Sequence, residues 1–144
     1  MAFPDRIERT VQLAHPPERV WRALTTAEGL GSWFGDDSAT IDLRPGSAAQ
    51  MRWTSGYRND MRVERVEEPT VFAFTWQIKG LPGGDPRRTY VEFTLQPADG
   101  GTRLTVVETG FAQLPDDVFK DEYQGHVEGW QRELGELASY LPAA

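Results

Sequence analysis

A change of hydrophobic period at Pro115 constrains the fold of this chain more than any other feature of its sequence. Between residues 38 and 109, apolar and polar residues alternate in short runs separated by Gly- and Pro-containing turn signals. This period of two predicts six strands that each have one apolar face and one solvent-exposed face, as in an antiparallel sheet. After Pro115, apolar residues recur every three or four positions as far as Leu141, which predicts one long helix over about 117–141.

The N-terminal part adds one more strand and two short helices. Residues 6–14 alternate and predict a strand, and Pro16-Pro17 then favours the start of a short amphipathic helix. Thr26 can cap a second short helix that runs to Trp33-Phe34. The element order predicts an α+β protein in which an antiparallel sheet packs against the long helix, with a cavity where the two do not close.

Glycines oppose both the second short helix and the long helix. Gly29 and Gly31 in the former, and Gly125, Gly129 and Gly135 in the latter, each cost about 1 kcal/mol relative to alanine. We expect the three in the long helix to mark a close approach or a bend beside whatever the helix covers.

Length and composition exclude several classes of protein. The 144 residues, without linker or repeat, are expected to form one domain over 1–144. The absence of cysteine excludes disulfides, zinc–thiolate sites, iron–sulfur clusters and a thiol nucleophile. A net charge of −7 opposes nucleic-acid binding. No run approaches the ~20 apolar residues of a membrane span, and no leader is visible, so we expect a cytoplasmic protein.

Standard catalytic and cofactor motifs are absent. The sequence contains no HExxH, no G-x-S-x-G and no P-loop, and its two histidines, His15 and His126, stand far apart. Asp36-Asp37 lacks the alternating ligands of a calcium loop and is interpreted as a turn and cap. We therefore expect neither a metal nor a cofactor.

Aromatic residues instead gather on the inward face of the predicted strands and on one stripe of the long helix. Ligand pockets are mostly apolar and aromatic, although the same rings could simply fill the core. The candidate ligand-binding residues are Trp33, Phe34, Trp53, Met61, Phe74, Trp76, Phe93, Phe111, Phe119, Tyr123 and Trp130, together with the polar Glu108 and His126. Trp53, Trp76 and Trp130 are the best candidates for the lining.

Glu108 and His126 are the two polar residues expected to face inward. Glu108 continues the Leu104 and Val106 face of its strand, and His126 shares the helix face of Trp130. A carboxyl among apolar groups and a histidine could act as acid and base on a bound carbonyl compound. The structural alternative is a histidine satisfied by one hydrogen bond and a glutamate that reaches water at the sheet edge.

The order of several short motifs resembles a known superfamily. The segment 14–25 (AHPPERVWRALT), then 33–36 (WFGD), 43–46 (LRPG) and Gly129-Trp130 resemble the bacterial SRPBCC or START-like superfamily. The narrower resemblance is to the branch named after the C-terminal domain of the activator of heat-shock-protein-90 ATPase. The resemblance covers essentially the whole chain and implies the helix-grip fold, in which a seven-stranded curved antiparallel sheet wraps a long C-terminal helix around a hydrophobic cavity.

Three functions follow as expectations. The first is binding of a small hydrophobic molecule, aromatic or lipid-like, in the cavity, without catalysis. The alternative, implied by relatives in the superfamily, is an enzyme similar to polyketide cyclases and dehydratases, using Glu108 and His126. A chaperone or protein-interaction module is a further alternative, although the sequence shows no counterpart of the chaperone-gripping domain of the eukaryotic activator. A monomer and a homodimer both remain open, as does gating of the cavity by the 80–86 loop.

Overall fold

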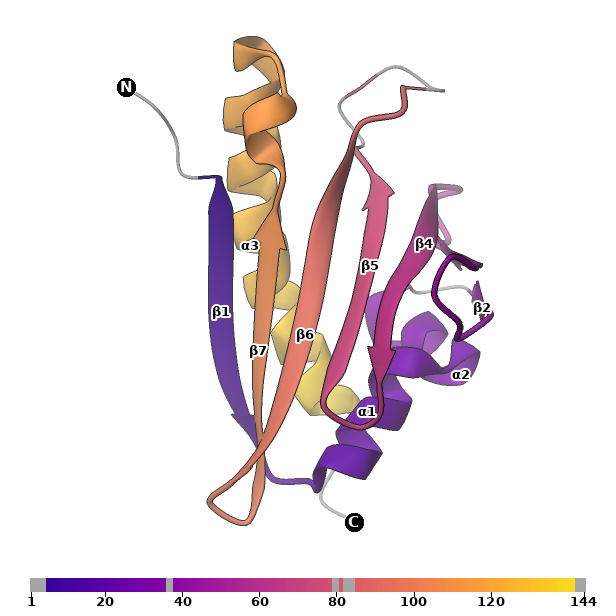
Figure 1. Cartoon of the computed structure of the whole chain (residues 1–144), viewed down its shortest axis with the longest axis vertical. Helices are drawn as coiled ribbons and strands as arrows, with labels where there is room; N and C mark the ends of the chain where they lie inside the picture. The colour runs from indigo at the N-terminus through magenta and orange to yellow at the C-terminus, as the bar shows by residue number, and fades with distance from the viewer. Residues whose placement is uncertain (1–4, 36–37, 79–80, 82–84, 142–144) are drawn as a thin grey trace.

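One seven-stranded antiparallel sheet is the frame of the protein (Figure 1). The computed structural model describes residues 5–35, 38–78, 81 and 85–141, so Asp36-Asp37 and most of the 80–86 loop lie outside the described residues. The strands are β1 (Arg6–Leu13), β2 (Ser38–Ile41), β3 (Ala48–Arg52), β4 (Arg58–Glu67), β5 (Val71–Gln77), β6 (Arg88–Ala98) and β7 (Gly101–Thr109). Their spatial order, β1-β7-β6-β5-β4-β3-β2, confirms the predicted sheet.

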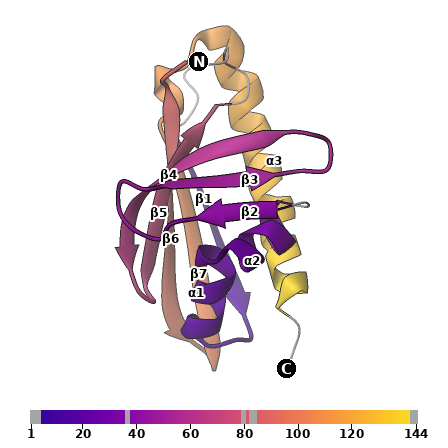
Figure 2. The same ribbon diagram turned by 90° about the vertical axis from the view of Figure 1, so that its right-hand side faces the viewer.

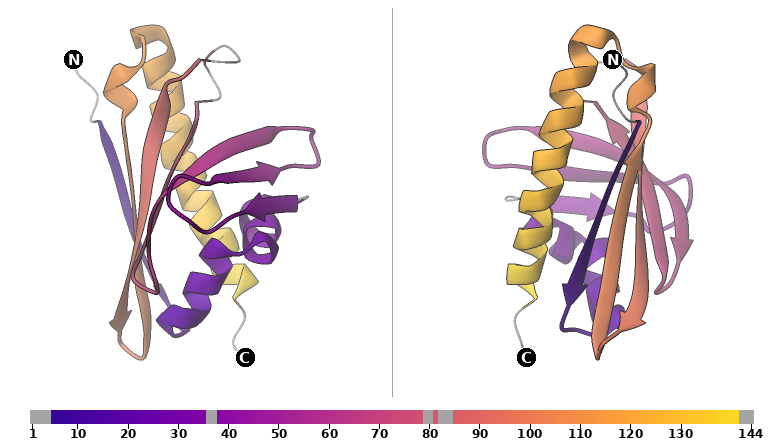
Figure 3. Two further views of the ribbon diagram at one scale, coloured as in Figure 1. Left: turned by 45° about the vertical axis from the view of Figure 1, so that its right-hand side comes forward. Right: turned by 90° about the vertical axis from the view of Figure 1, so that its left-hand side faces the viewer.

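The long helix predicted after Pro115 is α3 (Asp116–Tyr140), which lies along the inner face of the sheet (Figure 3). Its buried residues are Phe119, Trp130, Leu134 and Leu137, which continue the predicted stripe. The expected close approach at its glycines is wrong. A Cβ atom built at Gly125 or Gly135 would meet nothing within 4 Å, and one at Gly129 would meet only the Arg132 guanidinium, at 3.9 Å.

The two short helices lie between β1 and β2, but the second one is divided. After α1 (Pro17–Thr25), a single turn α2 (Ala27–Gly29), capped by the Thr26 hydroxyl, continues as the π-helical turn η1 (Leu30–Phe34). Gly29 is required here because a Cβ atom would lie 2.4 Å from the backbone oxygen of Ala23. A close approach thus exists in the short helices rather than along α3.

An irregularity in β4 bends the sheet toward α3. Val63 pairs with Phe74 and Arg65 with Ala73, so Glu64 is an extra residue in the ladder. Such a bulge increases the local twist and bends the strand. The β3–β4 hairpin accordingly turns away from the other strands and extends across α3 (Figures 2 and 3).

The end of α3 is tied to the loop after β1. The Nε2 atom of His15 lies 2.5 Å from the backbone oxygen of Leu141, and the Thr102 hydroxyl donates to the backbone oxygen of His15 at 2.7 Å. His15 is therefore a buried structural residue, remote from the pocket described below. None of the helices in the described part of the chain has the length and apolar character of a membrane span.

Alanine substitutions of two glycines test this packing. We expect Gly29→Ala to lower the free energy of unfolding by about 1–3 kcal/mol, because the added methyl overlaps the Ala23 carbonyl. Gly135→Ala should instead raise it by about 0.5–1 kcal/mol, because its Cβ enters open space in a helix. Urea denaturation of both variants measures the difference; a Gly29→Ala protein as stable as the parent would contradict the packing.

Candidate functional site

A pocket of about 460 Å³ lies where η1, the β3–β4 hairpin and β5 meet α3. One part of its lining comes from the sheet and η1, and the other comes from the middle of α3. The lining residues are Phe34, Trp53, Ser55, Tyr57, Asn59, Trp76, Gln77, Asp121, Glu122, Gly125, His126, Gly129, Trp130, Arg132 and Glu133.

Aromatic rings in contact with one another form the apolar part of the lining. The Phe34 ring meets the rings of Trp76 and Trp130 edge-on, with centroids 5.6 Å away in both cases. Trp76 and Trp130 stack on each other at 5.7 Å, and Trp53 lies against Tyr57 at 5.3 Å. Such edge-to-face and stacked pairs stabilise one arrangement of the rings beyond what burial alone provides.

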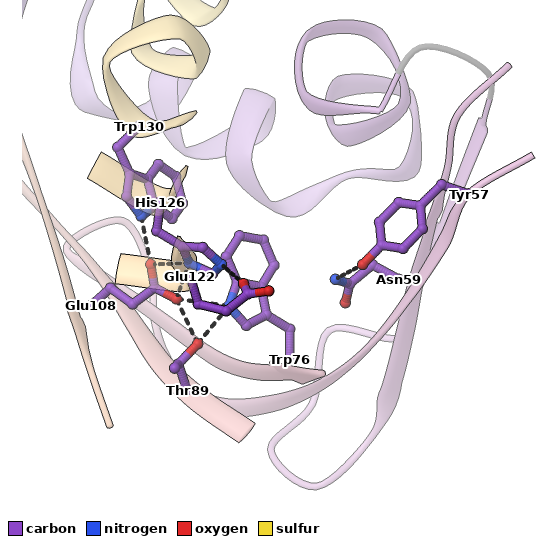
Figure 4. A network of polar contacts seen from close by, with 8 residues as sticks. All are labelled: Tyr57, Asn59, Trp76, Thr89, Glu108, Glu122, His126 and Trp130. Atoms are coloured by element: carbon purple, nitrogen blue, oxygen red, sulfur yellow. Dashed lines mark hydrogen bonds and ion pairs between the residues drawn. The ribbon is translucent and has the colours of Figure 1, made fainter. Parts of the chain in front are cut away.

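Behind these rings, the carboxylate of Glu108 accepts hydrogen bonds from four side chains (Figure 4). The indole nitrogens of Trp76 and Trp130 donate to it at 2.9 and 2.8 Å, and the Thr89 hydroxyl donates at 2.5 Å. His126 Nδ1 lies 2.8 and 2.9 Å from its two oxygens. We call these five residues the Glu108 network.

The strands and α3 bring the Glu108 network together by register and helical spacing. Glu108 points inward at the end of β7, on the face of Val106, as its parity predicted. Trp76 of β5 is directly paired with Thr89 of β6, and Val91 of β6 is paired with Glu108. His126 and Trp130 are four residues apart and therefore share one face of α3.

The surroundings of Glu108 suit a carboxylate, because its four partners supply donors. The two indole N–H groups can only donate to it, and the Thr89 hydroxyl, which accepts from Trp76, directs its proton to it. A buried carboxylate is tolerated when several donors satisfy it. Glu108 is 0 % exposed, so the alternative in which it reaches water at the sheet edge is wrong.

His126 is a protonated histidine held between two carboxylates. Burial lowers the pKa of His126, but hydrogen bonds to Glu108 and Glu122 and the attraction of both charges outweigh burial and raise the pKa to about 9. Its Nε2 atom lies 3.3 Å from the Glu122 carboxylate. Both ring nitrogens therefore face a carboxylate.

These contacts limit the acid–base chemistry of the Glu108–His126 pair. A general base needs a free lone pair within reach of its substrate. The oxygens of Glu108 are occupied by protein donors, and His126 has no unprotonated nitrogen at pH 7. The geometry therefore favours a positioning role, in which the pair fixes the Trp76 and Trp130 rings.

The residues predicted for the site divide into three groups. Phe34, Trp53, Trp76, His126 and Trp130 line the pocket, and Glu108 lies behind it. Trp33, Met61, Phe74 and Phe93 belong to the buried core. Phe111, Phe119 and Tyr123 form an aromatic cluster outside the lining, beside the start of β1, where the Tyr123 hydroxyl lies 3.2 Å from the Arg6 backbone oxygen. The Phe111 ring meets the His126 ring edge-on, with centroids 5.4 Å apart.

The polar part of the lining was not predicted from the sequence. It comprises Ser55, Tyr57, Asn59, Gln77, Asp121, Glu122, Arg132 and Glu133. Asn59 carried a usable signal, because it shares the inward parity of Met61 and Val63 and is buried like them. Gly125 and Gly129 carried another, since their spacing of four residues places them on one face of the helix. Among the described residues, no group of three His, Cys, Asp or Glu could hold a metal ion.

The curved sheet against a long C-terminal helix defines the SRPBCC-type, helix-grip class of protein. The family model described as "Activator of Hsp90 ATPase homolog 1-like protein" matches residues 14–142, and the chain belongs to this family. This confirms the resemblance inferred from the sequence. No curated protein matches the chain.

Solved structures with the same fold come from several bacteria. A Mesorhizobium loti protein is 27% identical, with 93% of this chain and 94% of that chain covered and a TM-score of 0.78. A Chromobacterium violaceum protein is 25% identical, with 99% and 100% covered and a TM-score of 0.76. DynU16, from the dynemicin biosynthetic locus, is 24% identical with a TM-score of 0.77. The match covers 95% of this chain but only 47% of DynU16.

The charge of His126 gives a testable pH dependence. Because folding raises its pKa from 6.5 to about 9, its contribution to stability is complete below pH 6.5 and is lost as the pH rises through 9. The loss is on the order of 3 kcal/mol at most. An NMR titration of the imidazole should show a midpoint near pH 9, and a His126→Gln variant should lack this part of the pH dependence. A midpoint below pH 7 would contradict the network.

Proposed function

We propose that this protein binds a small apolar, aromatic molecule in the pocket between α3 and the sheet. The observation that carries the proposal is the set of rings from Phe34, Trp53, Tyr57, Trp76 and Trp130 around one space of about 460 Å³. Small-molecule sites are typically clefts of roughly 300–1,000 Å³ with such walls and a few polar groups. The space is large enough for a compound of two or three fused rings.

The rigid walls of the pocket favour its interpretation as a binding site rather than as a space left by incomplete packing. Trp76 and Trp130 are fixed by their hydrogen bonds to Glu108, and Phe34 packs against both. A ligand that enters a preformed site loses less free energy to the ordering of side chains. Glu108 and Thr89, which do not line the pocket, therefore favour affinity without touching the ligand.

The glycines of α3 provide a second support. Gly125 and Gly129 line the pocket, and any larger side chain there would extend from a Cβ that has free space around it. Each glycine lowers the stability of the helix by about 1 kcal/mol relative to alanine. We interpret this loss of helix stability as the consequence of having residues without side chains where the helix lines the pocket.

The enzymatic and chaperone alternatives have less support. The polyketide cyclase-like alternative finds its parallel in DynU16 and in CalU16 from Micromonospora echinospora, which is 21% identical with a TM-score of 0.68. Likeness at this level concerns the fold alone. The occupied oxygens of Glu108 also disfavour it as the acid–base group of such an enzyme. A chaperone contact rests on the family description only.

Leucine substitutions of two α3 glycines separate pocket occupancy from changes in the helix. Gly129→Leu should weaken binding of the fluorescent apolar probe N-phenyl-1-naphthylamine at least tenfold, because the side chain enters the pocket. Gly135→Leu is the matched control, since its position is also open but lies outside the lining. Both changes favour the helix, so both variants should fold.

The readout is probe fluorescence in a titration of each protein. Unchanged affinity in Gly129→Leu would place the probe elsewhere and contradict the proposed pocket. Failure of the parent protein to bind this probe and other neutral aromatic compounds would contradict the function itself.

A further inference from the structure

An unpartnered acceptor lies in the wall of the pocket. Asn59 is 6 % exposed, and its Oδ1 atom accepts no hydrogen bond from any described residue. Its Nδ2 atom donates to the Tyr57 hydroxyl at 3.2 Å, and Oδ1 is the end of the amide that has no partner among the described residues. Leaving a buried carbonyl oxygen without a hydrogen bond is unfavourable. A ligand that donates a hydrogen bond at this point would remove the penalty.

The charges around the pocket favour a cation. Asp121, Glu122 and Glu133 of α3 belong to the lining, and the buried Glu108 lies behind it. His126 and Arg132 are the cations among the described lining residues, and His126 is already paired with both Glu108 and Glu122. Arg132 lies 3.4 Å from Glu133.

Four carboxylates therefore face two cations, and the wall has a net negative charge at neutral pH. In a partly enclosed site such a field raises the local concentration of cations and excludes anions. A carboxylate or phosphate group on the ligand would meet this field, and both cations among the described lining residues already face carboxylates.

The aromatic walls fit the same class of ligand. The faces of Trp and Tyr rings attract ammonium groups within about 6 Å, and the attraction increases when the groups are desolvated. Burial raises the pKa of Tyr57, and the nearby Glu122 charge raises it further, which shows that this carboxylate acts on the side of the pocket where Tyr57 and Asn59 lie. Figure 4 shows the Glu122 carboxylate turned toward that pair.

We propose that the ligand of this pocket is an organic amine, with an aromatic body against the rings that line the pocket and a protonated nitrogen that donates to Asn59 Oδ1 near Glu122. This inference rests on the proposed function and specifies its ligand class. Asn59 is then a specificity-determining residue, because it and the acidic side of α3 select a cationic donor over a neutral or anionic compound of equal size.

Three naphthalene probes of matched size test the charge preference: 2-(aminomethyl)naphthalene, 2-methylnaphthalene and 2-naphthoate, each titrated by calorimetry at pH 7. The amine should bind about tenfold more tightly than the methyl compound, and the carboxylate should bind most weakly. Added salt should weaken the binding of the amine and leave the affinity for the methyl compound unchanged, because screening acts only on charged probes.

Asn59→Leu tests the acceptor. The substitution removes a buried unpaired polar atom and keeps the branching at Cγ, so the variant should fold. It should lower the affinity for the amine about tenfold and leave the affinity for 2-methylnaphthalene unchanged. Glu122→Gln should also lower the affinity for the amine by a few-fold, without lowering the affinity for 2-methylnaphthalene.

The outcomes separate this inference from the proposed function. If the three probes bind equally, or 2-naphthoate binds most tightly, the inference is wrong while the pocket still binds small molecules. If Asn59→Leu binds the amine as tightly as the parent, Asn59 is not the acceptor and the inference is wrong. If none of the three probes binds, the proposed function fails together with the inference.

Discussion

The fully hydrogen-bonded carboxylate of Glu108 is the interaction on which the site depends. A buried charge of this kind is destabilising by several kcal/mol unless donors surround it, and here β5, β6 and α3 each supply at least one. Because the donors come from separate elements, the carboxylate also fixes which face of α3 lies against the sheet. The Trp76 and Trp130 rings are thereby held with their indole nitrogens toward Glu108.

The hydrogen bonding of Glu108 also determines which polar residues are available to a ligand. Glu108 and His126 satisfy each other inside the wall, so their contribution to the pocket is to fix the rings in place. Contact with a ligand is left to the aromatic faces and to the polar groups that line the space, of which Asn59 has an unused acceptor. In our proposal, the complete network keeps the pocket preformed, and the free acceptor of Asn59 receives a hydrogen bond from the ligand.

The sequence allowed the frame to be predicted but only part of the site. Strand alternation and the helical stripe after Pro115 predicted the sheet and α3, and parity placed Glu108 inside. The partners of Glu108 could not be predicted, because Trp76, Thr89 and Trp130 meet through strand register and helix docking rather than through any spacing along the chain. The polar lining was missed for a related reason. The position of its hairpin residues, Ser55, Tyr57 and Asn59, depends on the bulge at Glu64 that turns the β3–β4 hairpin toward α3, and alternation does not reveal such a bulge.

Urea denaturation of Glu108→Gln tests the central claim most directly. The amide keeps the size of the side chain but replaces one acceptor by an N–H₂ group that faces indole and imidazole donors. We expect the free energy of unfolding to fall by about 3–5 kcal/mol, or the fold to be lost, as when a buried ion pair loses one partner. Glu92→Gln is the control, because Glu92 pairs with Arg65 at 3.4 Å on the outer face of the sheet and should change stability by less than about 1 kcal/mol. Equal stabilities of the two variants would contradict the role assigned to Glu108.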